Sequence, residues 1–494
     1  MSRIAAQLAI ADTNLHRSLS SETEQQVLVS LKSVNEKFMQ TYPGDKTERQ
    51  PVHTFYGGAH LFKSDTIPKL GKLALIAIHT HAANFAEFAR AVGLPDNKKL
   101  PASKKQAEVL RKKLKKEGSL PESKNKNAWI ANTVYNRIIE KLTHQPIEDY
   151  RVDFEDGFGY RTDAEEDHEA MRTAHETASA MEQNLLPPFF GIRIKSFSEE
   201  SKKRAIRTLD IFLTTLFEKS GGRLPENFVV TLPKVVSSEQ IKSLVRLLRA
   251  FEQLHRLPDG KLKLEFMIES PQVIIGSNGQ SPLTDIVTAG EGRCVSAHFG
   301  PYDYTTGLNI SSRFQTLDHP ACDFARQAMQ VALAGTGVRL SDGAIHQIPV
   351  GPHRASGKVL SVRQMKENRE AVHGVWKNYF VQVQRSLSQG FYQSWDLHPG
   401  HLPVRYAAVY NFYLEGLEAA SLRMKSSIEK GNQASLSGQM FDDAASGQGL
   451  LNFFYRGIQC GAFTEKEIQH SGLNAEDLRA GSFTAMIASR KNKP

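Results

Sequence analysis

The sequence repeats one pattern of secondary structure, in which a short run of β-branched and aromatic residues precedes a longer amphipathic stretch. Eight such runs occur in the 494 residues, and after a first interval of 97 residues their starts lie 31 to 51 residues apart. Each later interval is close to the length of one strand plus one helix, so the pattern predicts an α/β fold, a (β/α)8 TIM barrel. The predicted strands are HTFYGGA (53–59), YRVDFEDG (150–157), FFGIRIKS (189–196), NFVVTLPKV (227–235), KLEFMIES (263–270), CVSAHFG (294–300), GAIHQIP (343–349) and SWDLHP (394–399).

A doubly wound open sheet is the alternative fold. Such a sheet would carry a G-x-G-x-x-G turn after its first strand, and the sequence YGGAHLF (56–62) lacks this turn. We therefore expect a barrel over residues 49–400, with a helical extension on each side and a basic insertion in the first long connection. The N-terminal extension is expected over residues 1–48, the basic insertion over about 98–126, and the C-terminal extension over 401–494.

Several helices are predicted from amphipathic patterns. In the N-terminal extension, Ser21 and Glu24 match a capping box before a helix that ends at Pro43-Gly44. In the C-terminal extension, FDDAASGQGL (441–450) fits either a lid with glycine hinges that carries Asp442 and Asp443 or, as we prefer, a helix N-cap before a buried helix. Helical patterns also cover residues 163–184, 199–220, 237–254 and about 406–430.

The formal net charge of +9 by itself suggests nucleic acid, a membrane surface or an anionic metabolite as partner. However, residues 98–126 hold eleven Lys/Arg and three Glu, a net charge of +8, so the rest of the chain is nearly neutral. This segment predicts a solvated helix with Val109, Leu110 and Leu114 turned inward and Gly118 at its end, or else a docking site for an acidic partner. Without interleaved aromatic residues, it does not favour nucleic-acid binding.

The cysteines and the apolar runs point to a cytoplasmic protein with no membrane contact. Three scattered cysteines are too few for a disulfide framework. The longest apolar run, LALIAI (73–78), is too short to cross a bilayer, and residues 1–15 do not resemble a signal peptide.

Charged residues follow several of the predicted strands, at the end of the barrel where active sites lie. Isolated carboxylates there are commonly helix caps, but a set from five strands in one barrel mouth needs compensating charges. A bound cation would compensate the carboxylates, and an anionic substrate would compensate the arginine and the lysine. The candidates are Asp153, Glu155, Asp156, Arg193, Lys234, Glu269, Asp303 and His398.

Two of these carboxylates favour a metal ion. Glu269 lies in the apolar strand LEFMIES, and Asp303 lies in the loop FGPYDYTTG, where glycine and proline can bring it close to a fixed ion. Two carboxylates with open coordination positions suit Mg²⁺, with Mn²⁺ as the alternative. Zinc is disfavoured because no histidine pair or cysteine cluster has the required spacing.

Six motifs occur in the order found in one known family. DFEDGFG (153–159), GIRIKSF (191–197), TLPKV (231–235), FMIES (266–270), HFGPYDYTTG (298–307) and GFYQSWDLHP (390–399) together resemble the HpcH/HpaI aldolase–citrate lyase beta-chain family of phosphoenolpyruvate/pyruvate-type barrels. The resemblance covers about residues 50–400. The chain is longer than typical members, and it has VHTFYGGAH where the family has a strand like R-S-x-L-F-V-P-G.

The resemblance implies a role for each matching position. Glu269 and Asp303 would bind Mg²⁺, and Arg193 would bind the substrate carboxylate or the enolate oxygen. Glu155 and Asp156 would orient water on the metal, while Lys234 matches a motif position without an assigned role. Candidates for further substrate contacts are Gly300, Pro301 and His398.

The implied activity is that of a carbon–carbon lyase or aldolase, acting on a small 2-oxo or hydroxy acid, free or as an acyl-CoA thioester, through a metal-stabilised enolate. The resemblance also implies a homo-oligomer, since relatives can take an acid from a neighbouring subunit. Two alternatives stay open: phosphoryl transfer or hydrolysis on a phosphoenolpyruvate-like substrate, and a non-catalytic barrel that serves as a binding subunit. Candidates for the general base are His298, His346, His398 and Asp342.

Overall fold

Eight parallel strands form one sheet in the order β7-β6-β5-β4-β3-β2-β1-β8. The computed structural model describes residues 18–44, 48–116, 125–355, 359–436, 444–479 and 481–491. A parallel bridge between Ser341 and Gln393 joins the two outer strands and closes the sheet into the predicted TIM barrel. The strands are β1 (His53–Gly58), β2 (Asp149–Asp153), β3 (Phe189–Arg193), β4 (Phe228–Leu232), β5 (Lys263–Ile268), β6 (Cys294–Phe299), β7 (Arg339–Ser341) and β8 (Ser394–Asp396).

The barrel interior contains a buried ionic network instead of a purely apolar core. Arg151 of β2 reaches across the barrel to β5, where its Nε and Nη2 each lie 2.8 Å from a carboxylate oxygen of Glu265. Its Nε also lies 3.1 Å from the hydroxyl of Thr231 on β4. Because side chains alternate between the two faces of a strand, the residues between these polar positions form the apolar outer face. This alternation explains why the strand sequences contain both polar and apolar residues and are not continuously hydrophobic.

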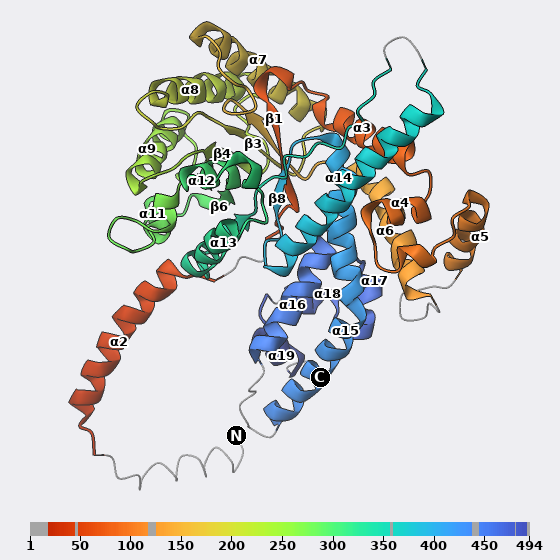
Figure 1. Ribbon diagram of the computed structural model, residues 1–494. Coiled ribbons are helices and arrows are strands. Elements are labelled where there is room, and N and C mark those ends of the chain that lie inside the picture. The colour runs from red at the N-terminus through yellow and green to blue at the C-terminus, as the bar shows by residue number, and fades with distance from the viewer. Residues whose placement is uncertain are drawn as a thin grey trace. The chain divides into compact units, whose positions relative to one another are not determined.

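Helices surround the strands, and Figure 1 shows α7, α8 and α9 on the outer side of the sheet. The predicted helices at 163–184, 199–220 and 237–254 are present with small changes at their ends. The helices are α2 (Ser21–Thr41), α3 (Thr66–His81), α4 (Phe85–Val92), α5 (Lys104–Leu114), α6 (Lys126–His144), α7 (Asp163–Glu182), α8 (Lys202–Lys219), α9 (Ser238–Leu254), α10 (Pro271–Ile274), α11 (Leu283–Ala289), α12 (Pro301–Gly307), α13 (Pro320–Leu333), α14 (Val362–Ser388), α15 (Leu402–Leu436), α16 (Ala444–Gln459), α17 (Glu465–Ile468), α18 (Ala475–Arg479) and α19 (Phe483–Lys491).

The sequence placed the seventh strand too late. The actual strand, β7, covers Arg339–Ser341, whereas residues 343–349 follow it without regular secondary structure. The three residues of β7 are too few for a recognisable alternation of apolar and polar positions. The strand was predicted instead in the more apolar segment GAIHQIP.

Two helix details also differ from expectation. The N-cap of α2 is Ser20 rather than Ser21, and the Ser20 hydroxyl accepts a hydrogen bond from the main-chain N–H of Thr23. In α5, Leu114 is buried as expected, but Val109 is 64% exposed. Ala107 takes the inward position instead, because it lies seven residues, two helical turns, before Leu114. Gly118, Asp442 and Asp443 lie outside the described residues.

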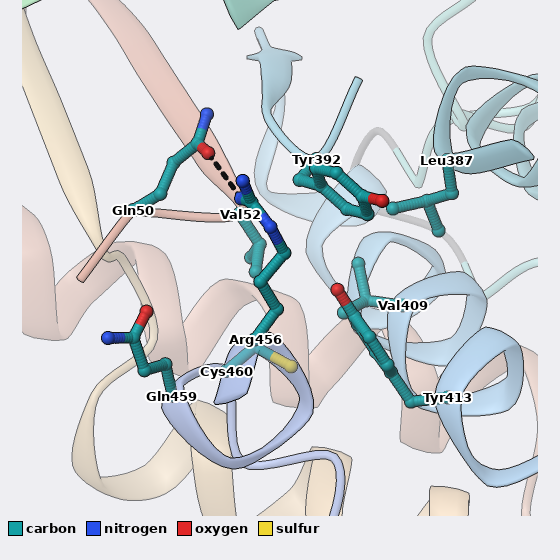
Figure 2. Close-up of a pocket in the computed structure, with 9 residues that line it drawn as sticks. All are labelled: Gln50, Val52, Leu387, Tyr392, Val409, Tyr413, Arg456, Gln459 and Cys460. Carbon is teal, nitrogen blue, oxygen red and sulfur yellow. Dashed lines mark hydrogen bonds between the residues drawn. The ribbon is translucent and has the colours of Figure 1, made fainter. Parts of the chain in front are cut away.

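The C-terminal helices pack onto the N-terminal end of the barrel. The guanidinium of Arg456, from α16, lies 4.1 Å from the ring centre of Tyr392 and donates a 2.7 Å hydrogen bond to Gln50, just before β1 (Figure 2). The cavity beside Arg456 measures about 10 Å³ and can hold about one water molecule. This cavity is therefore a packing junction and is too small for a substrate.

Of the described residues, 18–44 group with Leu333–Gly337 in a unit distinct from the rest of the chain. Its helix α2 has no buried residue. Within the described residues, every helix is too short or too polar to cross a lipid bilayer.

Candidate active site

Six charged side chains at or just after the ends of strands β2 to β6 approach one another at the C-terminal end of the barrel. We call this group the mouth cluster. All six were candidates from the sequence, and a β/α barrel brings them together because the carboxyl ends of its parallel strands share one rim. The mouth cluster consists of Glu155, Asp156, Arg193, Lys234, Glu269 and Asp303.

Arg193 is held by a carboxylate that the sequence left without a role. Its Nε and Nη2 donate hydrogen bonds of 2.7 and 2.5 Å to the two carboxylate oxygens of Asp153. This bidentate pair fixes one edge of the guanidinium, while Nη1 lies 3.2 Å from Glu155 at the mouth. The guanidinium carbon lies 4.8 Å from the ring centre of Tyr56. Arg193 is thus a rigid, buried cation with one edge directed at the cluster.

Lys234 places a second cation among the carboxylates. Its ammonium group contacts Glu155 and lies 3.3 Å from Asp156 and 3.8 Å from Asp303. The residue has a φ of +50°, in the left-handed region that a side chain with a Cβ rarely adopts. Burial opposes the charge on Lys234, but Glu269 and Glu155 raise its pKa above the usual lysine value. Strained backbone of this kind is commonly retained where function requires it.

Glu269 is the deepest carboxylate of the cluster and is 4% exposed. Its Oε2 accepts a 2.7 Å hydrogen bond from the main-chain N–H of Lys234. Burial raises the pKa of Glu269 to about 8; Glu155 and Asp303 add to the rise, and Lys234 opposes it. A Cβ at residue 300 would lie 2.6 Å from Glu269 Oε1, so the absence of a side chain at Gly300 makes room for this carboxylate.

Glu155 and Asp156 behave as an unequal pair. Burial and the neighbouring carboxylate of Asp156 raise the pKa of Glu155. Burial also disfavours ionisation of Asp156, but Arg193 and hydrogen bonding lower its pKa below the usual value. Two adjacent carboxylates whose pKa values are shifted apart can hold and release one proton between them.

The donor set fits a hard divalent cation bound with the help of water or substrate. In the part of the chain that the structure describes, no group of three His, Cys, Asp or Glu side chains has the arrangement of a metal site made by protein alone. Mg²⁺ commonly uses one or two carboxylates and keeps several waters, which suits Glu269 and Asp303. Burial chiefly raises the pKa of Glu269, and the carboxylates of Glu155 and Asp303 add to the rise; a divalent cation bound there would favour the ionised form.

The other sequence candidates for substrate binding have different positions. Gly300 adjoins Glu269, and Pro301 is the buried first residue of α12. His398 caps the short 3₁₀ helix Pro399–His401, where its Nδ1 accepts a hydrogen bond from the N–H of Gly400. Burial lowers the pKa of His398. In the described residues its contacts join it to this turn and not to the mouth cluster.

The described contacts of the remaining general-base candidates are with residues outside the mouth cluster. Asp342 directly follows β7, and it is buried against Arg326 and the hydroxyl of Ser386. His346 is exposed and stacks on the ring of Tyr302. His298 lies inside the barrel, where its Nδ1 is 3.0 Å from the hydroxyl of Tyr56.

Two residues that position the cluster were missed or left unassigned by sequence reasoning. Asp153 holds Arg193, and Tyr56 of β1 lies against the same guanidinium. The signal for Asp153 was present, because it shares a strand face with Glu155 in the motif D-x-E-D. Tyr56 carried no signal, because an aromatic residue in a strand is equally expected in any barrel core.

Comparisons with known proteins give limited likeness in sequence. No curated protein is significantly similar to the chain. Among solved structures, a citrate lyase from Burkholderia xenovorans LB400 is 16% identical, with a TM-score of 0.45 over 69% of this chain and 92% of that one. A malate synthase of Haloferax volcanii in a pyruvate/acetyl-CoA ternary complex is 13% identical, with a TM-score of 0.40 over 74% and 70%. The magnesium/glyoxylate complex of the Haloferax volcanii malate synthase is 12% identical, with a TM-score of 0.39 over 84% and 99%.

One family model matches residues 31–486 and so includes the barrel, the basic insertion and most of the C-terminal extension. Its description is Domain of unknown function (DUF6986). Because the match covers most of the chain, the protein belongs to the DUF6986 family.

Proposed function

We propose that this protein is a divalent-metal-dependent carbon–carbon lyase or aldolase. It acts on a small 2-oxo or hydroxy acid, free or as an acyl-CoA thioester, and cleaves or forms the bond beside a carbonyl through an enolate. The observation that carries the proposal is the environment of Glu269: a buried carboxylate with a pKa near 8, next to Glu155 and Asp303, in a barrel mouth that also holds Arg193.

A divalent cation held by Glu269 and Asp303 would supply positive charge for the oxygens of a 2-oxo acid. The chain's own residues supply the rest. Arg193 is fixed by Asp153 and directs Nη1 at the mouth, where it can bind a carboxylate or the oxygen of the enolate. Because Arg193 is buried, its charge acts through little water and is already oriented before substrate arrives.

The pair of Glu155 and Asp156 supplies proton transfer in this proposal. Bond cleavage in an aldol requires removal of a proton from the hydroxyl group, and the resulting enolate then takes up a proton at carbon. Glu155, whose pKa is raised, can hold that proton between the two steps. Lys234 contacts Glu155 and keeps it directed toward the mouth.

The test is a set of assays with Mg²⁺ and three substrates: oxaloacetate, malyl-CoA and phosphoenolpyruvate. We expect carbon–carbon cleavage, measured as pyruvate from oxaloacetate or acetyl-CoA from malyl-CoA. Glu269→Gln should lower turnover at least a hundredfold, because the loss of a ligand should cost at least as much as the loss of a group that orients one. The matched control is Glu226→Gln, an exposed residue just before β4, at the other end of the barrel.

Three results would contradict the proposal. Phosphate release from phosphoenolpyruvate without cleavage of the other two substrates would indicate phosphoryl chemistry. Full turnover by Glu269→Gln in EDTA-treated buffer would remove the metal from the mechanism. A folded protein without any of these activities, but with a binding partner, would support a non-catalytic barrel.

A further inference from the structure

We propose that the groove between α3, α5 and α6 is a binding site for a chain of linked phosphates, such as inorganic triphosphate or the triphosphate tail of a nucleotide. The site is built on helices in the connection between β1 and β2, and its residues are separate from the mouth cluster. The proposal therefore stands independently of the lyase chemistry.

The first observation is unneutralised positive charge on α5 and the residues that follow it. Residues 104–116 carry seven Lys/Arg and one Glu. Within the described ranges, only Arg111 among these seven cations lies within 4 Å of a carboxylate, 3.7 Å from Glu108. Elsewhere, exposed helical lysines are commonly paired, as Lys69 is with Asp65 at 2.8 Å. Such a run of unpaired cations repels itself and attracts anions from solution.

The second observation is a groove beside this charge, with a volume of about 540 Å³. Three helices contribute hydrogen-bond donors to it: His79 from α3, Arg111 from α5, and Asn136 and His144 from α6. Tyr135 also lines the groove, and Glu140 is the one acidic residue among the described residues that line it. A guanidinium, imidazole rings and an amide together suit the oxygens of a phosphate group.

The length of helix over which the cations are spread favours a ligand with several linked anionic groups. Helix α5 has eleven residues and is therefore about 16 Å long, and its cations are distributed along it. A single phosphate would satisfy Arg111 and leave the lysines unpaired, whereas a triphosphate can contact the groove and part of the row of lysines. The groove has the volume of a small-molecule site, which is too small for a folded acidic protein. Tyr135 is buried and the basic segment has no aromatic residue, so a stacking surface for single-stranded RNA is missing from the described part of this region.

The test is calorimetric titration of the full chain with sodium triphosphate, ATP and orthophosphate at low and moderate salt. We expect triphosphate and ATP to bind at least tenfold more tightly than orthophosphate, with affinity falling as salt rises. Arg111→Glu and His144→Ala should each weaken triphosphate binding, the first by tenfold or more. The control is Lys219→Glu, an exposed charge reversal at the end of α8, which should leave binding unchanged. Equal binding of triphosphate and ATP would indicate recognition of phosphates alone, and tighter binding of ATP would add contacts to the nucleoside; both outcomes support the site.

Other outcomes overturn it. Absence of triphosphate binding at low salt would do so, as would orthophosphate binding as tight as that of triphosphate. Binding that Arg111→Glu leaves intact would place the anion elsewhere. The same titration with a single-stranded RNA oligonucleotide and with an oligo-aspartate peptide completes the test, because tighter binding of either would assign the basic helix to that class of macromolecule. Since Arg111 is 49% exposed, its substitution should not prevent folding, and circular dichroism of each variant verifies this.

Discussion

The main-chain N–H of Lys234 donates a 2.7 Å hydrogen bond to Glu269, while the side chain of Lys234 extends to the other carboxylates of the mouth cluster. One residue therefore orients the deepest carboxylate and supplies the cation that compensates its neighbours. The left-handed backbone at Lys234 makes this double contact, since it turns the chain sharply after β4.

Lys234 should compete with a divalent cation for the same carboxylates. Once Glu269 is ionised, Lys234→Met should therefore bind Mg²⁺ about tenfold more tightly, equivalent to about 1.4 kcal/mol. Because Lys234 lowers the pKa of Glu269, the variant should need a higher pH than the wild-type protein to reach this affinity, so the titrations are run as a pH series. Lys234→Gly should show the same gain and should be about 1 kcal/mol more stable than Lys234→Met, because both variants lack the ammonium and only glycine tolerates the left-handed backbone. Calorimetric titration and urea unfolding measure the two effects. Unchanged or weaker Mg²⁺ binding in both variants would mean that the ammonium does not occupy the cation's place.

Gly300→Ala should disturb Glu269 directly. The added Cβ would lie 2.6 Å from Glu269 Oε1, so the carboxylate must move, and overpacking of this kind costs about 1–3 kcal/mol. We expect weaker Mg²⁺ binding and a lower melting temperature. Gly374→Ala is the matched control, because a Cβ added at this position within α14 would have no neighbouring atom within 4 Å, and the change should be neutral or stabilising. Equal behaviour of the two variants would show that Glu269 tolerates a side chain at position 300.

Asp153→Asn should release Arg193 and leave a buried guanidinium without its bidentate partner. Breaking a buried ion pair on one side typically costs about 3–5 kcal/mol, which urea unfolding can measure. In the proposed reaction, substrate KM should rise as the orientation of Arg193 is lost. Asp163→Asn is the comparison, because Asp163 is 85% exposed in its pair with Arg204 and should change stability by less than about 1 kcal/mol. Similar losses in both variants would contradict the role of Asp153.

His401 should make the protein less stable in mild acid. Burial lowers its pKa to about 4, while Asp396 opposes the shift. Between pH 6.5 and 4 the unfolded chain binds a proton at this position that the folded chain does not, so this contribution to stability falls as pH decreases through that window. His401→Gln keeps a donor for the main-chain oxygen of Gln347 and should flatten the slope. Melting temperatures from pH 4 to 7 provide the measurement, and parallel curves for the two proteins would disprove the assignment.

The local pattern of the sequence was sufficient to predict the barrel and to name all six residues of the mouth cluster as candidates. The strand ends could be read because side chains alternate along a strand, and a charged residue such as Glu269 is conspicuous in an apolar strand. Strand β7 was not predicted, because its three residues are too few to show an alternation of apolar and polar positions. The exposure of Val109 was not predicted either, because the sequence of this short helix is compatible with more than one buried face.

What only the tertiary structure decided is which charges meet. The pairing of Arg193 with Asp153 joins residues 40 positions apart, and the place of Lys234 depends on a backbone conformation that local sequence does not require. The position of His398 was also decided by the tertiary structure: its motif suggests a site residue, but its side chain caps the 3₁₀ helix Pro399–His401. Periodicity determines which face of an element is buried, whereas contacts between distant residues depend on strand register and barrel closure, which the whole chain settles together.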